Sequence, residues 1–451
     1  MGGMGIDAAF GARVGSKLIA LFKYEGTRMP VLSLAYATGI LRQAGVEVHV
    51  VDAGHQPDDD PALLSQIATL GPDWVIAATS FGFLASELAF LARVHEACGA
   101  QRMLVGYAAE HFGDEILARG LAEEIASGDP ETAFARLAGS GDVQSSDRYV
   151  ADLDTLPFPD WQGFPVDDYA YFPLLKRRPF LILQASRGCP YGCRFCPYPV
   201  TQGLRFRGRS VDSVVDEMIY LRDRFGAKSL LFRDPTFSFD LDRTKQLARE
   251  MTRRRVQVDF GIETRLDCLD EESLDLLAEA GCLSVEFGVD SLDPEVLKAW
   301  KRRGFSPEKA RGLVNHMESL GMAGAGLFVI GLPEQDVADV ERTLDWLLST
   351  DLSYVNVERA TPFPGTPLYS ESVAKGWTPE ITLSDLEHGD PKLRSNGIEE
   401  DAGLQALQDR FLRRFYLRPA RVARELARGD IGLNVAFVLR CLWRQGRRHL
   451  R

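Results

Sequence analysis

The chain has 451 residues, of which 45% are hydrophobic and 26% are charged. This balance is typical of a globular protein with several domains, and it excludes a mainly disordered or collagen-like chain. The 52 Lys and Arg residues against 64 Asp and Glu residues give a net charge of −12, which argues against a nucleic-acid partner.

The first part of the chain alternates apolar strands with amphipathic helices. After an N-terminus of residues 1–15 that we expect to be flexible, the predicted strands are 17–22, 46–51, 74–79 and 102–106. The predicted helices are 30–45, 62–70, 84–97 and 111–119. This alternation predicts a Rossmann-like, doubly wound parallel sheet over residues 16–140. Such sheets bind ligands beyond the carboxyl ends of their strands.

A Pro-rich stretch, residues 154–160, cannot form regular structure and predicts a linker over residues 141–179. A second alternating region follows, with predicted strands at 181–185, 229–232, 257–262, 283–288, 325–330 and 354–358. Helices are predicted at 211–225, 242–253, 271–280, 293–300, 307–320 and 337–347. Six strand–helix units predict a (β/α)6 partial TIM barrel over residues 180–370.

The last part of the chain, residues 371–451, predicts a helical and basic C-terminal region. Residues 409–451 hold twelve Arg and three acidic residues, a net charge of +9, and the rest of the chain carries −21. One interpretation is an interfacial helix that contacts anionic lipid or a lipid-like substrate. The other is a helical cap that docks on the acidic barrel region.

The most apolar window of the chain does not predict a membrane span. Residues 74–91 are interrupted by polar side chains such as Ser80 and Glu87, and predict a strand, a loop and a helix. The apolar run 18–22 is too short for a signal-peptide core. We therefore expect a cytoplasmic protein, with peripheral membrane contact only if the basic tail binds lipid.

Three of the seven cysteines fall within eight residues. Cys189, Cys193 and Cys196 have the spacing C-x3-C-x2-C and follow the first strand of the second region. Thiolates this close together suit an iron–sulfur cluster or zinc. A structural zinc site needs a fourth ligand, and the nearest other cysteine in the sequence is Cys268, so the pattern favours a cluster with one open iron.

The triplet, with Phe195 before its last cysteine, resembles the signature of the radical S-adenosylmethionine (SAM) superfamily. The resemblance covers residues 180–369 and extends to segments 232–237, 286–291, 329–334 and 361–369. It implies that Cys189, Cys193 and Cys196 bind a [4Fe–4S] cluster. It further implies contacts to SAM from Phe195, Asp234, Glu286, Val329 and Ile330. Many members carry a Gly-Gly-Glu type sequence where this chain has Asp234.

The first region resembles the cobalamin-binding domains that precede many radical SAM enzymes. The likeness lies in the strand order and in segments 30–35, 50–53 and 127–131, the last being a variant of a closing Gly-Glu-Gly-Glu. It implies cobalamin contacts from Tyr24, Ser80 and Gly106. The chain lacks the cobalt-ligating Asp-x-His-x-x-Gly pattern, and Tyr107 stands where a small residue would admit the corrin tail. A degenerate domain kept for substrate binding or structure is the alternative.

The family resemblance implies reductive cleavage of SAM to a 5′-deoxyadenosyl radical, with the electron from a flavodoxin- or ferredoxin-type donor. The leading hypothesis is cobalamin-dependent methylation of an unactivated carbon in a small molecule. The alternatives are radical cyclisation or rearrangement, a non-catalytic iron–sulfur or cobalamin sensor, and a zinc-binding interaction module. Three arginines that we expect around the barrel mouth suit an acidic substrate: Arg187, Arg233 and Arg265. No catalytic residue is assigned.

Overall fold

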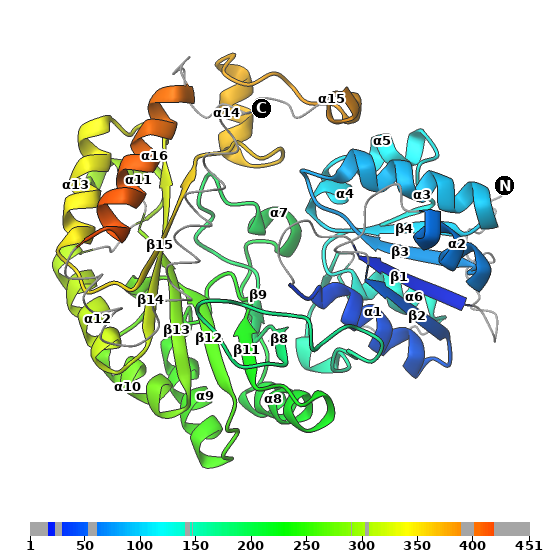
Figure 1. Ribbon diagram of the computed structural model, residues 1–451, viewed down its shortest axis with the longest axis horizontal. Coiled ribbons are helices and arrows are strands. Elements are labelled where there is room, and N and C mark those ends of the chain that lie inside the picture. The colour runs from blue at the N-terminus through cyan, green and yellow to red at the C-terminus, as the bar shows by residue number, and fades with distance from the viewer. Residues whose placement is uncertain are drawn as a thin grey trace. The chain divides into compact units, whose positions relative to one another are not determined.

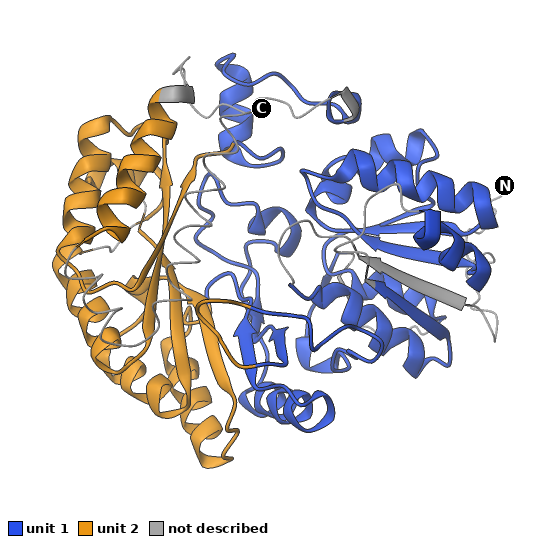
Figure 2. Cartoon of the chain, viewed as in Figure 1, with its two compact units in different colours: residues 1–170, 178–236, 362–393 blue, residues 171–177, 237–361, 394–451 orange. Residues whose placement is uncertain are grey.

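The computed structural model (Figure 1) describes residues 17–22, 29–52, 61–139, 145–146, 148–289, 291–302, 306–388 and 401–418. Two compact units make up the chain (Figure 2). Unit 1 comprises residues 1–170, 178–236 and 362–393, and unit 2 comprises residues 171–177, 237–361 and 394–451. The N-terminus predicted to be flexible lies outside the described residues.

Unit 1 contains a five-stranded parallel sheet in the order β2-β1-β3-β4-β5. Its strands are β1 (Lys17–Phe22), β2 (Glu47–Asp52), β3 (Trp74–Ala78), β4 (Gln101–Val105) and β5 (Glu124–Ala126). The order reverses between β1 and β3, which is the kind of switch point beside which doubly wound sheets bind ligands. The four predicted strands are present, and β5 is an additional strand that the sequence did not reveal.

Helices cover both faces of this sheet. They are α1 (Leu32–Gln43), α2 (Pro61–Leu70), α3 (Leu84–Cys98), α4 (Tyr107–His111), α5 (Gly113–Ala118) and α6 (Glu131–Leu137). Figure 1 shows α1 and α6 on one face and α2 and α3 on the other. The predicted helix 111–119 is divided into α4 and α5.

The next part of unit 1 includes the segment that carries the three cysteines. Strands β8 (Phe180–Leu183) and β11 (Ser229–Phe232) pair in parallel and are joined through α8 (Val211–Phe225). Between them lie α7 (Tyr198–Gln202) and the antiparallel pair of β9 (Ser186–Arg187) and β10 (Arg207–Gly208). The predicted linker contains little regular structure, namely β6 (Ser145–Ser146), β7 (Tyr149–Val150) and a 3-10 turn at Leu153–Thr155.

Unit 1 is completed by two helices from late in the sequence, α14 (Pro367–Ala374) and α15 (Leu383–His388). Tyr369, Ile381 and Leu383 are buried in the same core cluster as Leu84 and Leu88 of α3. The start of the predicted C-terminal region is therefore part of the N-terminal core.

Unit 2 contains four parallel strands in the order β15-β14-β13-β12. They are β12 (Asp259–Thr264), β13 (Cys282–Gly288), β14 (Ala323–Ile330) and β15 (Tyr354–Arg359). The helices are α9 (Leu241–Arg253), α10 (Glu271–Glu279), α11 (Pro294–Ala299), α12 (Pro307–Ser319), α13 (Val337–Leu348) and α16 (Asp401–Tyr416), and Leu266–Cys268 form a 3-10 turn. All six predicted strands of the second region are present, and the predicted α/β class with parallel sheets is confirmed.

Helix α16 packs against β15. Phe411 and Phe415 are fully buried, and the Tyr416 hydroxyl donates to the Val355 carbonyl oxygen at 2.7 Å. Arg414 pairs with Asp345 of α13 at 2.9 Å. This first part of the basic tail thus docks as a cap on the acidic region, whereas residues 419–451 lie outside the described residues. Among the described helices, none is long and apolar enough to cross a membrane.

Candidate functional site

The three cysteines lie on one loop of unit 1, between β9 and α7. The loop begins at Gly188, which has a φ of +77°. A Cβ added at this position would overlap the Arg205 carbonyl oxygen, so only glycine fits. The Cys189 N–H donates to the Gly203 carbonyl oxygen, and the Cys196 N–H to that of Cys193, both at 3.1 Å. These bonds hold a compact loop on which all three thiols are half-buried.

The chemistry of this donor set fits an iron–sulfur cluster. Three thiols on a short loop can bind three irons of a [4Fe–4S] cluster and leave the fourth open. Among the described residues, no three Cys, His, Asp or Glu side chains already stand in a metal-binding arrangement. The assignment of Cys189, Cys193 and Cys196 as cluster ligands therefore rests on their spacing and their common loop.

A buried ion-pair network holds the N-terminal side of the cysteine loop. Arg187, only 5% exposed, donates from both terminal nitrogens to the Glu131 carboxylate at 2.7 and 2.8 Å. Its guanidinium is also 3.1 Å from Asp129, which pairs in addition with Arg207. Burial alone would lower the pKa of Arg187, but Glu131 and Asp129 outweigh it and hold that pKa well above its usual value. The guanidinium stays charged and ties β9 to the turn after β5.

A second buried pair lies behind the first. Arg209 pairs with Glu217 of α8, and Tyr36 of α1 is buried near both ion pairs. Burial, together with the Glu217 charge, raises the pKa of Tyr36 far above its usual value, so its hydroxyl keeps its proton. The Arg187 guanidinium stacks over the Tyr36 ring at 5.3 Å from the ring centre. Helix α1 is thereby fixed to the strands that carry the cysteine loop.

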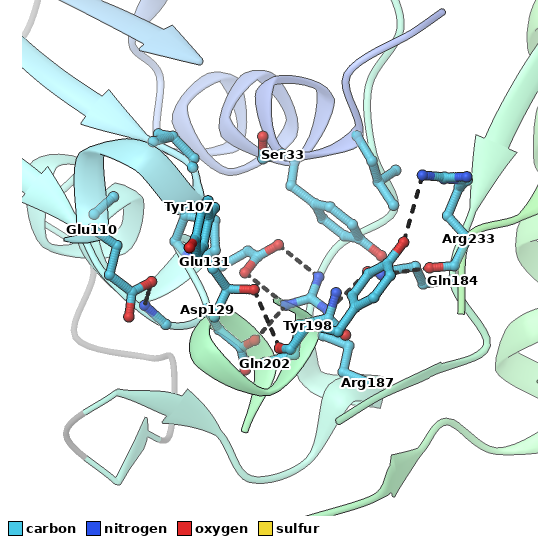
Figure 3. Close-up of a pocket in the computed structure, with 18 of the residues that line it drawn as sticks. Ser33, Tyr107, Glu110, Asp129, Glu131, Gln184, Arg187, Tyr198, Gln202 and Arg233 are labelled. Atoms are coloured by element: carbon cyan, nitrogen blue, oxygen red, sulfur yellow. Dashed lines mark hydrogen bonds and ion pairs between the residues drawn. The ribbon is translucent and has the colours of Figure 1, made fainter. Parts of the chain in front are cut away.

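A pocket of about 440 Å³ opens beside this network (Figure 3). Its wall comes from α1, from the ends of β4 and β5, and from β8 and α7; it includes Ser33, Tyr36, Gly106, Tyr107, Glu110, Asp129, Glu131, Gln184, Arg187, Tyr198 and Arg233. The pocket thus lies at the carboxyl ends of the parallel strands, where open α/β sheets bind ligands. Ligand pockets typically span about 300–1,000 Å³.

Gly106 and Tyr107 form one wall of the pocket. Gly106 has a φ of +120°, and an added Cβ would lie 2.6 Å from the Thr79 carbonyl oxygen, so only glycine fits. The Tyr107 hydroxyl donates to the Pro364 carbonyl oxygen, and its ring packs edge-on against Phe363. Burial raises the pKa of Tyr107 above its usual value. The phenol is therefore held at the wall, where it was predicted to limit the space for a corrin tail.

Of the three residues predicted to contact cobalamin, the structure describes two, and it separates them. Gly106 lines the pocket, whereas Ser80 lies outside it and its N–H donates to Glu87 at 3.1 Å. Tyr24 lies outside the described residues. Sequence reasoning missed Asp129 and Glu131 as partners of Arg187, although both lie in the segment 127–131 on which the cobalamin-domain resemblance rests.

The predicted SAM contacts in unit 1 are Phe195 and Asp234. Phe195 is half-buried on the cysteine loop. Asp234 is completely buried, and its two oxygens accept hydrogen bonds from the Ala185 N–H at 3.0 Å and the Ser186 hydroxyl at 2.6 Å. These bonds give Asp234 a structural function, since they fix the strand that leads into the cysteine loop. Its contact with SAM stays a prediction.

The predicted SAM contacts in unit 2 lie on neighbouring strands. Glu286 of β13 is 5% exposed, and the Tyr171 hydroxyl lies 2.7 Å from each of its carboxylate oxygens and donates to them. Glu263 of β12 stands beside Glu286 in the parallel register. Sequence reasoning missed the contact with Tyr171, because that residue is 115 positions away in the chain. It also gave no role to Glu263.

Val329 and Ile330 of β14 cannot both point at one ligand, because successive strand side chains face opposite sides of a sheet. Phe328 packs against Phe411 of α16, with 5.4 Å between ring centres, so residues of that parity face the helices. Ile330 shares this parity and is buried, whereas Val329 is half-exposed on the face that also carries Glu286. Of the two predicted adenine contacts, only Val329 has the orientation that the prediction requires.

The arginines predicted to suit an acidic substrate are largely engaged within the chain. Arg187 pairs with Glu131, as above, and Arg265 pairs with Asp267 at 2.5 Å. Arg233 lines the pocket, 3.5 Å from the Tyr198 hydroxyl. Two of the three guanidinium groups already have carboxylate partners, so they do not support an acidic substrate.

Residues 183–347 match the model of the radical SAM superfamily, and the chain therefore carries a radical SAM domain. The family predicted from the cysteine triplet is confirmed.

Two curated relatives of similar sequence are methyltransferases by name. The chain is 26% identical over 277 residues to an uncharacterized methyltransferase of Pyrococcus horikoshii. The aligned region covers 61% of this chain and 59% of that protein. It is 28% identical over 285 residues to the cytidylyl-2-hydroxyethylphosphonate methyltransferase of Streptomyces wedmorensis, with 60% and 53% coverage. The chain thus spans little more than half the length of these relatives.

Among solved structures, the chain is similar in fold to the radical SAM methyltransferase TsrM from Kitasatospora setae, determined with cobalamin and a [4Fe–4S] cluster bound. The TM-score is 0.68 with 21% sequence identity, and the alignment covers 88% of this chain and 91% of TsrM. At this identity the likeness is one of fold.

Proposed function

We propose that the protein is a radical SAM C-methyltransferase that holds a [4Fe–4S] cluster on Cys189, Cys193 and Cys196 and binds cobalamin in the pocket of unit 1. The observation that carries this proposal is the cysteine loop itself, with three thiols at C-x3-C-x2-C spacing inside a matched radical SAM domain. When bound, such a cluster supplies the electron, taken from a flavodoxin- or ferredoxin-type donor, that cleaves SAM into methionine and a 5′-deoxyadenosyl radical.

The chain's own residues would hold and orient SAM. In this proposal the six parallel strands of the second region form a (β/α)6 partial barrel, and their polar side chains line its interior. Glu286, kept in place by Tyr171, is suited to accept hydrogen bonds from the ribose. Val329 and Phe195 offer apolar surface to the adenine. Asp234 supports SAM binding indirectly, because it fixes the strand that presents the cysteine loop.

The unit 1 pocket has properties that suit cobalamin. It lies at the carboxyl ends of a doubly wound, Rossmann-like sheet, and Gly106 lets the backbone approach a ligand closely. The carboxylates of Asp129 and Glu131 are neutralised by Arg187 and Arg207, so this wall suits an uncharged ligand rich in amides. Cobalamin would supply the methyl group. The methyltransferase relatives and the cobalamin-containing TsrM support this assignment.

Anaerobic reconstitution tests the cluster. The full chain should take up about four irons and four sulfides per molecule. Cys193→Ala should lose most of this iron and all cleavage of SAM, whereas Cys98→Ala, a matched change at a half-buried thiol outside the loop, should keep both. Full iron content and SAM cleavage in Cys193→Ala would contradict the proposed ligands.

The products and cofactor uptake then separate the reaction types. Methyl transfer predicts bound cobalt and formation of S-adenosylhomocysteine beside 5′-deoxyadenosine when substrate is present. Formation of 5′-deoxyadenosine alone would indicate cyclisation or rearrangement instead. Bound cluster or cobalamin without any SAM cleavage would indicate a sensor.

A further inference from the structure

The segment that begins α14 meets the cysteine loop directly. The Leu368 N–H donates to the Arg194 carbonyl oxygen at 3.0 Å, and the Arg194 guanidinium forms an ion pair with Glu371 one helical turn further along. Arg194 stands between Cys193 and Cys196 in the sequence. A backbone bond and an ion pair thus join α14 to the part of the loop that carries two of the three thiols.

The position of Glu371 is fixed by the rest of unit 1. Thr366 caps the N-terminus of helix α14, because its hydroxyl accepts from the Tyr369 N–H, and Pro367 is the first residue of the helix. Tyr369 is buried in the core of the N-terminal sheet, and its hydroxyl accepts from the Ile381 N–H at 2.8 Å. Since α14 is anchored in this core, Glu371 is presented to Arg194 at a defined place.

The Arg194–Glu371 pair is only partly exposed, with 21% and 22% of the two side chains accessible. Charges in such a setting act on their neighbours more strongly than fully solvated ones, because water screens them less. The Glu371 carboxylate has a second cationic partner, Lys375, at 2.6 Å, and the Lys375 side chain is about half exposed.

We propose that Glu371 is a positioning residue that holds the Arg194 guanidinium against the cysteine loop, and that this ion pair sets the reduction potential of the cluster on that loop. The proposal rests on the proposed function, because it requires the cluster. Reduction adds one electron, and therefore one negative charge, to the cluster, and nearby charge is one of the factors that set cluster potentials. Arg194 favours the reduced form, and Glu371 offsets part of that effect.

The test compares charge-neutralising variants of the reconstituted full chain by spectroelectrochemical titration of the cluster. Glu371→Gln removes one negative charge but keeps a side-chain oxygen that can accept from the guanidinium and hold it in place, so the potential should shift to more positive values. Arg194→Gln leaves the carboxylate and should shift it to more negative values. Arg194→Lys keeps the charge and should restore most of the parent potential. Lys375→Gln is the matched control, because it removes one positive charge beside Glu371 but off the cysteine loop, and it should shift the potential less than Arg194→Gln.

Opposite shifts in Glu371→Gln and Arg194→Gln support the proposal, since a merely structural disturbance would not change sign with charge. Equal potentials in all variants, shifts of one sign in both, or an equal shift in Lys375→Gln would overturn it while leaving the cluster assignment intact. Absence of iron and sulfide in the parent chain would overturn both proposals, and the metal analysis made before each titration distinguishes these cases.

Discussion

The two sides of the cysteine loop are held by arginines in very different surroundings. Arg187, before the first cysteine, is 5% exposed and contacts two buried carboxylates, Asp129 and Glu131. Arg194, between the second and third cysteines, is one-fifth exposed, and Glu371 is its carboxylate partner. A deeply buried pair tolerates the loss of a partner poorly, whereas a partly exposed pair can change with a smaller cost in stability. The Arg187 network therefore makes the first side of the cysteine loop rigid. On the second side, the charges of Arg194 and Glu371 can be changed with less effect on stability.

The largest expected effect comes from breaking the buried pair. Glu131→Gln leaves Arg187 without its bidentate partner and should reduce the free energy of unfolding by about 3–5 kcal/mol. The same change at the other side, Glu371→Gln, should cost about 1 kcal/mol or less. Urea unfolding of the two variants and the parent measures both values. Equal losses in the two variants would remove the distinction between the two anchors.

A second comparison uses two glycines, one at the start of the cysteine loop and one beside α14, which contacts the other side of that loop. Gly188→Ala places a Cβ against the Arg205 carbonyl in addition to the strain of a positive φ, which by itself costs about 1–2 kcal/mol. Gly376→Ala, just beyond α14 at a φ of +69°, meets no atom within 4 Å and should cost only that strain. Iron content after reconstitution should fall in Gly188→Ala and stay at the parent level in Gly376→Ala. Retained iron in both would show that the first side of the loop is more plastic than we infer.

A smaller effect is expected at Pro364, which precedes α14 and accepts a hydrogen bond from Tyr107. Tyr107→Phe removes the hydrogen bond to Pro364 and should lower the free energy of unfolding by about 0.5–1.5 kcal/mol. Iron content should not change, because the cysteine loop keeps its own contacts. Urea unfolding and metal analysis of the same preparation check both points. A loss of iron in this variant would contradict the inference that the cysteine loop does not depend on this contact.

The smallest expected effect is a pH dependence at His111. Burial lowers the pKa of His111, whose ring packs against Phe112 and Tyr369. The folded state therefore binds the proton less readily than the unfolded chain, so the contribution to stability is complete above about pH 6.5 and is lost as the pH falls below it. His111→Phe should flatten the change in urea midpoint between about pH 7.5 and about pH 5.5. An unchanged slope would contradict this assignment.

The sequence predicted local features of this molecule better than partners that are distant in the chain. Apolar runs between turn residues located the strands of both regions, and cysteine spacing located the loop. The pairing of Arg187 with Glu131 spans 56 residues, and that of Arg194 with Glu371 spans 177. Neither residue type nor spacing specifies such a pairing, because only the folded chain brings the two charges together.

Two further differences have particular causes. The return of α14 and α15 to the N-terminal core was missed because an apolar residue such as Tyr369 or Leu383 indicates burial without indicating against which core. The two-sided alternation of β14, in contrast, was available from the sequence, and it would have separated Val329 from Ile330. Residue identity alone could not show that Asp234 uses both of its oxygens to hold the strand before the cysteine loop.

The central claim is that the cysteine loop holds a cluster whose fourth iron is open to SAM. The electron paramagnetic resonance spectrum of the reduced, reconstituted chain, recorded before and after addition of SAM, tests it most directly. The account predicts that SAM changes the spectrum and that methionine and 5′-deoxyadenosine then form. An identical spectrum with SAM left intact, in a chain with full iron and sulfide content, would contradict it.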